Sequence, residues 1–238
     1  AKYELEVTLV ERQPDLAMET TKANSAILHA GFDAKPGTLK AECSVRGLEL
    51  YRQWREALDL DIQYVGSLVV ARAEDGWERL QQLLERGQEN GVKNLSLIDK
   101  QTLLAMEPAL SETVLGALWA PDAGIIWPFG AALAFAENAV ANGARILTRC
   151  EVSAIGMEDG RVCGVYTNQG FFEADYIVNA AGVRADEISR MAGDDSFAIA
   201  PRKGEYILFD RAASGKVKHV IFPLPTAVSK GILISTTV

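Results

Sequence analysis

The chain contains 238 residues, with 48% hydrophobic and 24% charged side chains. That length can form one or two domains with a sizeable core, and the composition excludes disordered and collagen-like chains. The net charge of −8 and the pI near 4.9 argue against nucleic acid as the main partner. An anionic ligand would therefore have to be held by a local basic cluster.

The cysteines and the apolar segments indicate the cellular compartment of the protein. None of the three cysteines belongs to a C-x-x-C pair, so they are typical of ordinary thiols in a reducing compartment. The sequence has no 18-residue apolar run and no signal-peptide pattern at its start. We therefore expect a cytoplasmic protein without a metal site. Both ends of the chain resemble strands within a fold, so we also expect it to be cut from a longer protein.

The first half of the chain predicts short strands alternating with helices. Thr38, Asp75 and Asp99 can each cap the helix that follows them, and Pro128 suits the first turn of another. The predicted elements are a parallel strand at 6–10, a helix over 39–58, two short strands within 61–71, a helix to about 90, a short helix ending at 107, a strand at 114–120 and a helix over 128–142.

The second half predicts strands in quick succession, with one helix. Asp159 and Gly160 mark a tight hairpin. The predicted strands lie at 144–147, 151–158, 161–167, 171–173, 176–179, 198–209, 217–222 and 231–236, and the helix at 185–192. Strands that alternate with helices, together with antiparallel hairpins, predict an α/β fold of mixed α+β character with a second, antiparallel sheet. The interleaving indicates that neither domain is continuous in sequence.

Two residues could carry oxidoreductase chemistry. Glu11 ends a strand, where a dinucleotide-binding unit uses a carboxylate to bind ribose hydroxyls, although many strands end in Glu for solubility. The sequence contains no G-x-G at all, so no phosphate loop supports that interpretation. His29 is the natural base for taking the hydroxyl proton of an alcohol at neutral pH, and a histidine bonded within a turn is the alternative. His219 is expected to be exposed in a polar linker.

Small and basic residues supply the remaining candidates. Ala30 and Gly31 would let a cofactor ring approach closely. Arg202 and Lys203 are consecutive, so in a strand at most one of them enters a pocket, and Arg is the better clamp for phosphate or carboxylate. A solvated charge pair is the alternative for these two residues.

Several blocks of sequence follow one another in an order that is specific to one family. They are Val7 to Glu11, Thr20 to Ser25, His29 to Gly31, Gly124 to Gly130, Thr148 to Ile155, Tyr176 to Val183 with Asp186, and Pro201 to Tyr206. In these blocks the chain resembles the FAD-dependent glycerol-3-phosphate dehydrogenases of the anaerobic, large-subunit type, within the D-amino-acid oxidase superfamily. A close relative with the same pattern is the L-2-hydroxyglutarate oxidase group.

The resemblance implies an FAD-dependent oxidoreductase fold with an incomplete Rossmann-like flavin domain at 1–60 and 129–193 and an antiparallel-sheet substrate domain at 61–128 and 194–238. It implies His29 as the catalytic residue and Arg202 and Lys203 as substrate-binding residues. The cofactor-binding residues that it implies are Glu11, Thr20, Thr21, Asn24, Ser25, Ala30, Gly31, Val152, Ala180, Ala181 and Gly182.

The implied reaction is oxidation of sn-glycerol 3-phosphate to dihydroxyacetone phosphate, a small anionic substrate. A quinone or a partner subunit would accept the electrons, and the longer enzyme could attach to a membrane surface. The alternatives are an L-2-hydroxyglutarate oxidase and a non-catalytic fragment that no longer binds FAD. The resemblance begins after the family's first strand and phosphate loop, so we expect weak FAD binding by this chain.

Overall fold

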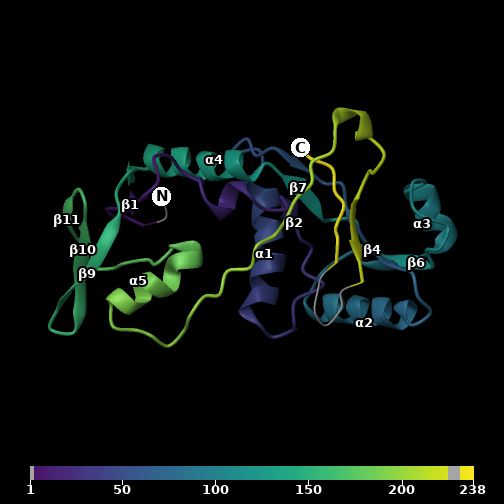
Figure 1. Ribbon diagram of the computed structural model, residues 1–238, viewed down its shortest axis with the longest axis horizontal. Coiled ribbons are helices and arrows are strands. Elements are labelled where there is room, and N and C mark those ends of the chain that lie inside the picture. The colour runs from purple at the N-terminus through teal and green to yellow at the C-terminus, as the bar shows by residue number, and fades with distance from the viewer. Residues whose placement is uncertain (1–2, 225–230) are drawn as a thin grey trace. The chain divides into compact units, whose positions relative to one another are not determined.

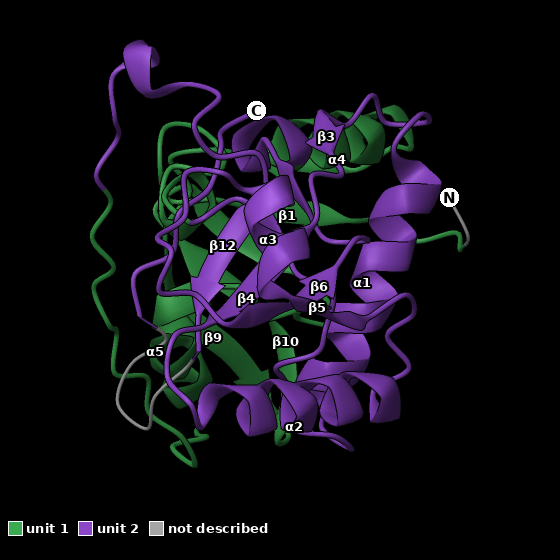
Figure 2. Ribbon diagram, turned by 90° about the vertical axis from the view of Figure 1, so that its right-hand side faces the viewer, with its two compact units in different colours: residues 1–24, 132–206 green, residues 25–131, 207–238 purple. Residues whose placement is uncertain are grey.

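The computed structural model describes residues 3–224 and 231–238. Its helices and strands (Figure 1) belong to two compact units (Figure 2): unit 1 comprises residues 1–24 and 132–206, and unit 2 comprises residues 25–131 and 207–238. These units place 25–60, 129–131 and 194–206 differently from the predicted flavin and substrate domains. The roles assigned to those two domains stay a prediction.

Unit 1 combines a parallel strand pair with an antiparallel meander. Strand β1 (Thr8–Val10) runs parallel to β8 (Arg145–Leu147), which follows helix α4 (Pro128–Ala141) in the chain. The meander has the order β11-β10-β9, built from β9 (Val152–Glu158), β10 (Arg161–Thr167) and β11 (Gly170–Glu173). The short helices are η1 (Thr20–Lys22), η2 (Gly182–Arg184) and α5 (Ala185–Met191).

Unit 2 contains a four-stranded and a three-stranded sheet. The larger sheet has the order β12-β4-β6-β5, and only the β12–β4 pair is parallel. Its strands are β4 (Ser67–Ala71), β5 (Ser96–Asp99), β6 (Gly116–Ala120) and β12 (Val220–Pro223). The smaller sheet, in the order β2-β7-β3, is made of β2 (Ile27–Leu28), β3 (Ile62–Gln63) and β7 (Gly124–Ile126).

The helices of unit 2 include α1 (Leu39–Trp54), α2 (Gly76–Glu89), α3 (Lys100–Met106) and the short η3 (Arg211–Ala213). Side chains of a strand alternate between faces, so Leu68 and Val70 of β4 pack with Leu103 of α3. On the other face, the backbone of α2 at Gly76 approaches Ala71 closely. The larger sheet is thus packed on both faces, with all five residues of β4 buried.

The predicted helix starts are mostly confirmed. Thr38 accepts a hydrogen bond from the backbone N–H of Ala41 at 3.3 Å, and Asp99 accepts one from Thr102 at 2.8 Å. Asp75 stands before α2 without a side-chain capping bond. The hairpin at Asp159 and Gly160 joins β9 to β10 with positive φ at both residues, as its sequence predicts.

Three predicted strands are wrong. Residues 176–179 and 198–209 form no strand, and 231–236 make only a single bridge, from Ile234 to Ile221. Tyr176, Val178 and Ile207 are between 81% and 89% exposed, so no neighbouring strand among the described residues covers them. A β-branched or aromatic run forms a strand only where a partner supplies the backbone hydrogen bonds.

Two glycines with nearly the same φ allow a test of the packing around β4. Gly66 and Gly37 have φ of +71° and +72°, but a Cβ on Gly66 would overlap the Trp119 indole, whereas one on Gly37 would meet nothing within 4 Å. Gly37→Ala should destabilise by about 1–2 kcal/mol, the cost of a Cβ in the left-handed region. Gly66→Ala should lose about 1–3 kcal/mol more through overpacking. Urea unfolding midpoints measure both losses, and equal losses would contradict the close packing.

Candidate functional site

In unit 1, Glu11 lies directly after β1 and continues its pairing with the chain beyond β8. Its N–H donates to the Leu147 carbonyl at 2.8 Å, and the Cys150 N–H donates to the Glu11 carbonyl at 2.9 Å. The half-buried carboxylate accepts a hydrogen bond from the Gln13 N–H at 2.8 Å. A carboxylate offers about four lone-pair sites, so acceptor capacity for ribose hydroxyls remains.

Val152 begins β9, two residues after Cys150. Because Cys150 is bonded to the backbone of Glu11, the structure brings the predicted ribose and adenine contacts into one part of unit 1. A further bond from the Arg149 N–H to the Gln13 carbonyl, at 2.9 Å, fixes the same two segments. Glu11 and Val152 could therefore hold the adenosine portion of a dinucleotide.

The segment around η1 is held by its own polar contacts. The Asn24 amide donates to the carbonyls of Thr20 and Thr21 at 3.2 and 2.7 Å. Glu19, just before η1, pairs with Arg12 at 2.7 Å. The hydrogen bond from Arg12 lowers the pKa of the Glu19 carboxyl and raises the pKa of the Arg12 guanidinium. These contacts hold the predicted pyrophosphate segment near the end of β1.

Residues 180–182 form an exposed turn that leads into α5. The Asn179 amide donates to the Ala185 carbonyl at 2.8 Å, and its oxygen accepts from the Ala181 N–H at 3.3 Å. Gly182 has φ of +56°, and a Cβ there would meet nothing within 4 Å. The turn's conformation, rather than crowding by other residues of the chain, therefore favours glycine at this position.

Asp186, in the first turn of α5, ties that helix to the following segment. Its carboxylate accepts hydrogen bonds from the Ile199 N–H at 3.2 Å and from Arg190 at 3.0 Å. The Ile199 contact, helped by Arg190 and opposed by burial, lowers the pKa of the Asp186 carboxyl.

In unit 2, His29 is half-buried just after β2. Its ring centroid lies 4.6 Å from that of Phe32 and 5.9 Å from that of Phe222. Ser25 precedes β2 in the same unit, whereas Thr20, Thr21 and Asn24 belong to unit 1.

The contacts of His29 assign the position of its proton. The backbone N–H of Gly31 donates to Nδ1 of His29 at 3.0 Å. A nitrogen that accepts this bond carries no proton, so the neutral ring is the tautomer protonated on Nε2. The lone pair of the neutral ring is therefore the one that the turn occupies, so His29 can act as a base only if the bond from Gly31 is exchanged.

The small residues after His29 also have a packing reason within the chain. Ala30 is 2% exposed, and a Cβ on Gly31 would lie 2.7 Å from the side chain of Val45. Gly31 also has φ of +106°. In this structure the protein's own packing accounts for the absence of a larger side chain at Gly31.

Arg202 and Lys203 are exposed and lie outside any strand, so the argument from opposite strand faces is wrong for them. Lys203 pairs with Glu205 at 2.8 Å, whereas Arg202 makes no ion pair with the described residues. They belong to unit 1, and His29 belongs to unit 2.

Sequence reasoning missed a carboxylate–imidazole pair in unit 2. Glu107 is 1% exposed, and its Oε1 lies 2.7 Å from Nδ1 of His219. The expectation that His219 is exposed is wrong, since its side chain is only 17% exposed. No local pattern predicts a contact between residues 112 positions apart.

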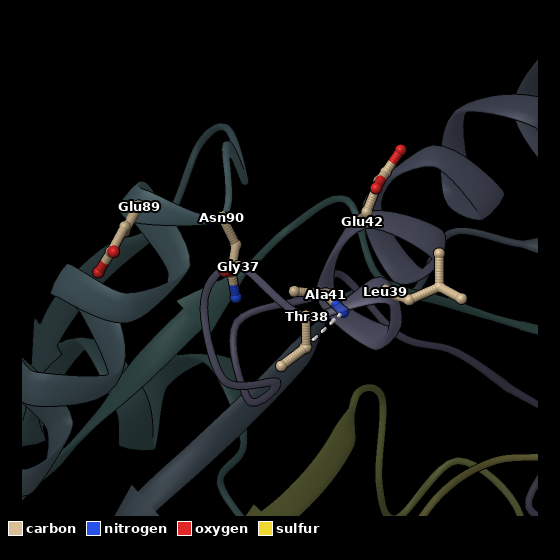
Figure 3. A pocket seen from close by; sticks show the side chains of 7 residues that line it. All are labelled: Gly37, Thr38, Leu39, Ala41, Glu42, Glu89 and Asn90. Atoms are coloured by element: carbon tan, nitrogen blue, oxygen red, sulfur yellow. Dashed lines mark hydrogen bonds between the residues drawn. The ribbon is translucent and has the colours of Figure 1, made fainter.

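A pocket of about 350 Å³ lies beside the start of α1 (Figure 3). Its lining residues are Gly37, Thr38, Leu39, Ala41, Glu42, Glu89 and Asn90. It contains none of the predicted site residues. Within residues 3–224 and 231–238, no three His, Cys, Asp or Glu side chains are grouped to hold a metal ion, and each helix is too short or too polar to cross a bilayer.

Comparison with known proteins gives a family match along nearly the whole chain. Residues 1–237 match the family described as FAD dependent oxidoreductase (DAO). The chain is 41% identical over 238 residues to a glycerol 3-phosphate dehydrogenase of Caloramator mitchellensis, covering 100% of this chain and 49% of that protein. It is 30% identical over 230 residues to the mitochondrial L-2-hydroxyglutarate dehydrogenase of Caenorhabditis elegans, covering 94% and 52%. The chain thus spans about half the length of these relatives.

A solved structure is similar in fold. The dithionite-reduced L-alpha-glycerophosphate oxidase of Mycoplasma pneumoniae, with FAD bound, matches with a TM-score of 0.82 and 29% identity, covering 98% of this chain and 62% of that one. The predicted family and fold class are confirmed by these findings.

The Asp186 contacts predict an acid-sensitive contribution to stability. A carboxyl whose pKa is lower in the folded state stabilises the fold above its unfolded pKa of about 3.9, and this contribution is lost as the pH falls through the folded value. Asp186→Asn should therefore destabilise the protein at pH 7, and the difference from the parent should shrink toward about pH 3. Urea midpoints at both pH values measure it, with the exposed Asp195→Asn as the charge-matched control. A loss that is the same at both pH values would contradict this account.

Proposed function

This chain belongs to the FAD dependent oxidoreductase (DAO) family, and from that premise we propose that it takes part in the oxidation of sn-glycerol 3-phosphate to dihydroxyacetone phosphate. The observation that carries the proposal is the 41% identity to the Caloramator dehydrogenase along the entire chain. Oxidation of L-2-hydroxyglutarate is the second candidate, supported by a relative of lower identity. The two substrates differ in the anionic groups that must be bound: glycerol 3-phosphate carries a phosphate, and L-2-hydroxyglutarate carries two carboxylates.

The residues of unit 1 fit an FAD site in their chemistry. Glu11 would bind the ribose hydroxyls, Val152 would lie against the adenine, and Thr20, Thr21 and Asn24 would line the path of the pyrophosphate. Ser25, Ala30, Gly31, Ala180, Ala181 and Gly182 are the further residues that we propose for cofactor binding. When bound, FAD supplies the acceptor for the hydride that leaves the carbon bearing the hydroxyl group.

His29 is the proposed acceptor of the hydroxyl proton. In the neutral ring Nδ1 holds the lone pair and Nε2 holds the proton. Proton acceptance at Nδ1 therefore requires that the bond from the Gly31 N–H be exchanged for one from the substrate hydroxyl. A base positioned in this way contributes about 10²–10⁴-fold to the rate.

Arg202 is the proposed clamp for the substrate phosphate, with Lys203 as a second positive charge. A planar guanidinium can donate two parallel hydrogen bonds to a phosphate, which an ammonium cannot. Lys203 is partly neutralised by Glu205, so Arg202 is the stronger candidate. We further propose that the electrons pass to a quinone or to a partner subunit.

The ribose contact can be tested by FAD affinity. Glu11→Ala should raise the Kd for FAD about 10–100-fold, because hydrogen bonds to a charged group contribute about 1.5–3 kcal/mol. Quenching of flavin fluorescence during titration measures the Kd. Glu6→Ala, which removes an exposed carboxylate preceding the same strand, is the matched control. Equal Kd values for Glu11→Ala and the parent would remove Glu11 from the proposed site.

The reaction can be tested by stopped-flow reduction of the flavin with glycerol 3-phosphate and with L-2-hydroxyglutarate. His29→Ala should lower the limiting reduction rate about 10²–10⁴-fold, with a smaller change in substrate affinity. Arg202→Ala serves as the contrasting variant, since loss of a binding contact should mainly raise KM. Reduction by neither compound would overturn the substrate proposal, and an unchanged rate in His29→Ala would leave that residue with its turn role only.

A further inference from the structure

Glu107 is a buried carboxylate whose contacts all lead to one short segment. It follows α3 directly, and its Oε1 accepts hydrogen bonds from the backbone N–H groups of Lys218 and His219 at 2.8 and 2.7 Å. The same oxygen lies 2.7 Å from Nδ1 of His219. Oε2 is buried and accepts no hydrogen bond from the described residues. A buried carboxyl group needs hydrogen-bond partners in place of water, and the three nitrogens around Oε1 all belong to Lys218 and His219.

The segment held by Glu107 leads directly into β12. Val220 follows His219 directly, donates its N–H to the Gly66 carbonyl at 3.1 Å and pairs with Ser67 of β4. The His219 ring also forms a T-shaped pair with Trp119 of β6, with centroids 5.0 Å apart and planes at 89°. Glu107 therefore determines where the chain joins the sheet.

The register of β12 against β4 determines which side chain of β12 lies beside His29. Successive side chains of a strand point to opposite faces, and a slip by one residue exchanges the faces. Ile221 packs into the core beside α3, together with Leu68 and Leu103. The ring of Phe222 lies toward His29 instead, at a tilt of 57°. A slipped strand would remove Phe222 from His29 and place its aromatic ring in the core position that Ile221 now fills.

We propose that Glu107 is a positioning residue for His29: it fixes the start of β12 so that Phe222 packs against the His29 ring. The packing of Phe222 against His29 does not depend on the proposed function, whereas the consequence for catalysis rests on it. Glu107 acts through β12, on the side of the sheet that faces α3.

The test uses the protein's two histidines, whose imidazole resonances are few enough to resolve by NMR. In Glu107→Ala, the His29 resonances should shift or broaden, and amide hydrogen exchange at Val220 to Phe222 should accelerate at least about tenfold, which is the response expected of a loosened strand. Glu107→Gln keeps one acceptor oxygen and should give an intermediate effect. Asp99→Ala is the matched control, because it removes the cap at the opposite end of α3 without touching 218–219.

A second variant keeps the proposal testable if Glu107→Ala does not fold. Phe222→Leu should alter the His29 resonances while leaving the exchange of the Lys218 and His219 amides unchanged. Unaltered His29 resonances in Glu107→Gln and in Phe222→Leu would overturn the proposal, as would an equal effect of Asp99→Ala.

The flavin reaction supplies a separate measurement. In Glu107→Gln the reduction rate should fall about 3–30-fold with little change in KM, since a base that is less well positioned affects the chemical step. A parent protein that fails to reduce FAD would defeat the proposed function, whereas the NMR result would still decide the positioning role. A change in KM alone would contradict positioning of His29.

Discussion

One carboxylate oxygen joins the two stretches of sequence that form unit 2. Oε1 of Glu107, from the first stretch, binds two backbone N–H groups and an imidazole from the second. Because β12 enters the larger sheet immediately after these contacts, the parallel pairing of β12 with β4 begins at a fixed residue. Parallel pairing needs such a constraint, since no tight turn links the two strands to set their register.

Other parts of the molecule show the same dependence on distant backbone contacts. The end of β1 is held against the chain near Cys150, more than 130 residues away. The predicted ribose and adenine contacts approach each other for that reason and not because they are near in sequence. The start of a helix, in contrast, is set by contacts within a few residues, such as the cap that Thr38 gives to α1.

This contrast explains which parts of the fold could be predicted from the sequence. Local signals predicted well: the caps at Thr38 and Asp99, the start of α4 at Pro128 and the hairpin at Asp159 were each confirmed. The strands predicted at 176–179 and 198–209 failed because apolar β-branched composition does not specify a partner. The short strands β5 and β7 were not predicted, because their few residues leave too little periodicity to detect.

In the candidate site, too, short-range contacts could be predicted and long-range contacts could not. The contacts of Asn24 with Thr20 and Thr21 span three or four residues, a range that turn chemistry can predict. The pairing of Glu107 with His219 spans 112 residues, and neither residue carries a local signal for it. At Gly31 the sequence could not show a second reason for a small residue, because the Val45 side chain that a Cβ would meet is brought there by the fold.

The two histidines show what a family resemblance cannot transfer. A resemblance identifies a residue, but the chemistry of an imidazole depends on which nitrogen holds the proton, and a neighbouring group sets that. At His29 a backbone N–H donates to Nδ1, so the neutral ring presents a donor at Nε2. At His219 a carboxylate oxygen faces Nδ1, so Nδ1 is the donor and the lone pair of the neutral ring lies on Nε2. The same side chain thus has opposite polarity at its outer nitrogen in two places of one unit, and only the partner of Nδ1 distinguishes them.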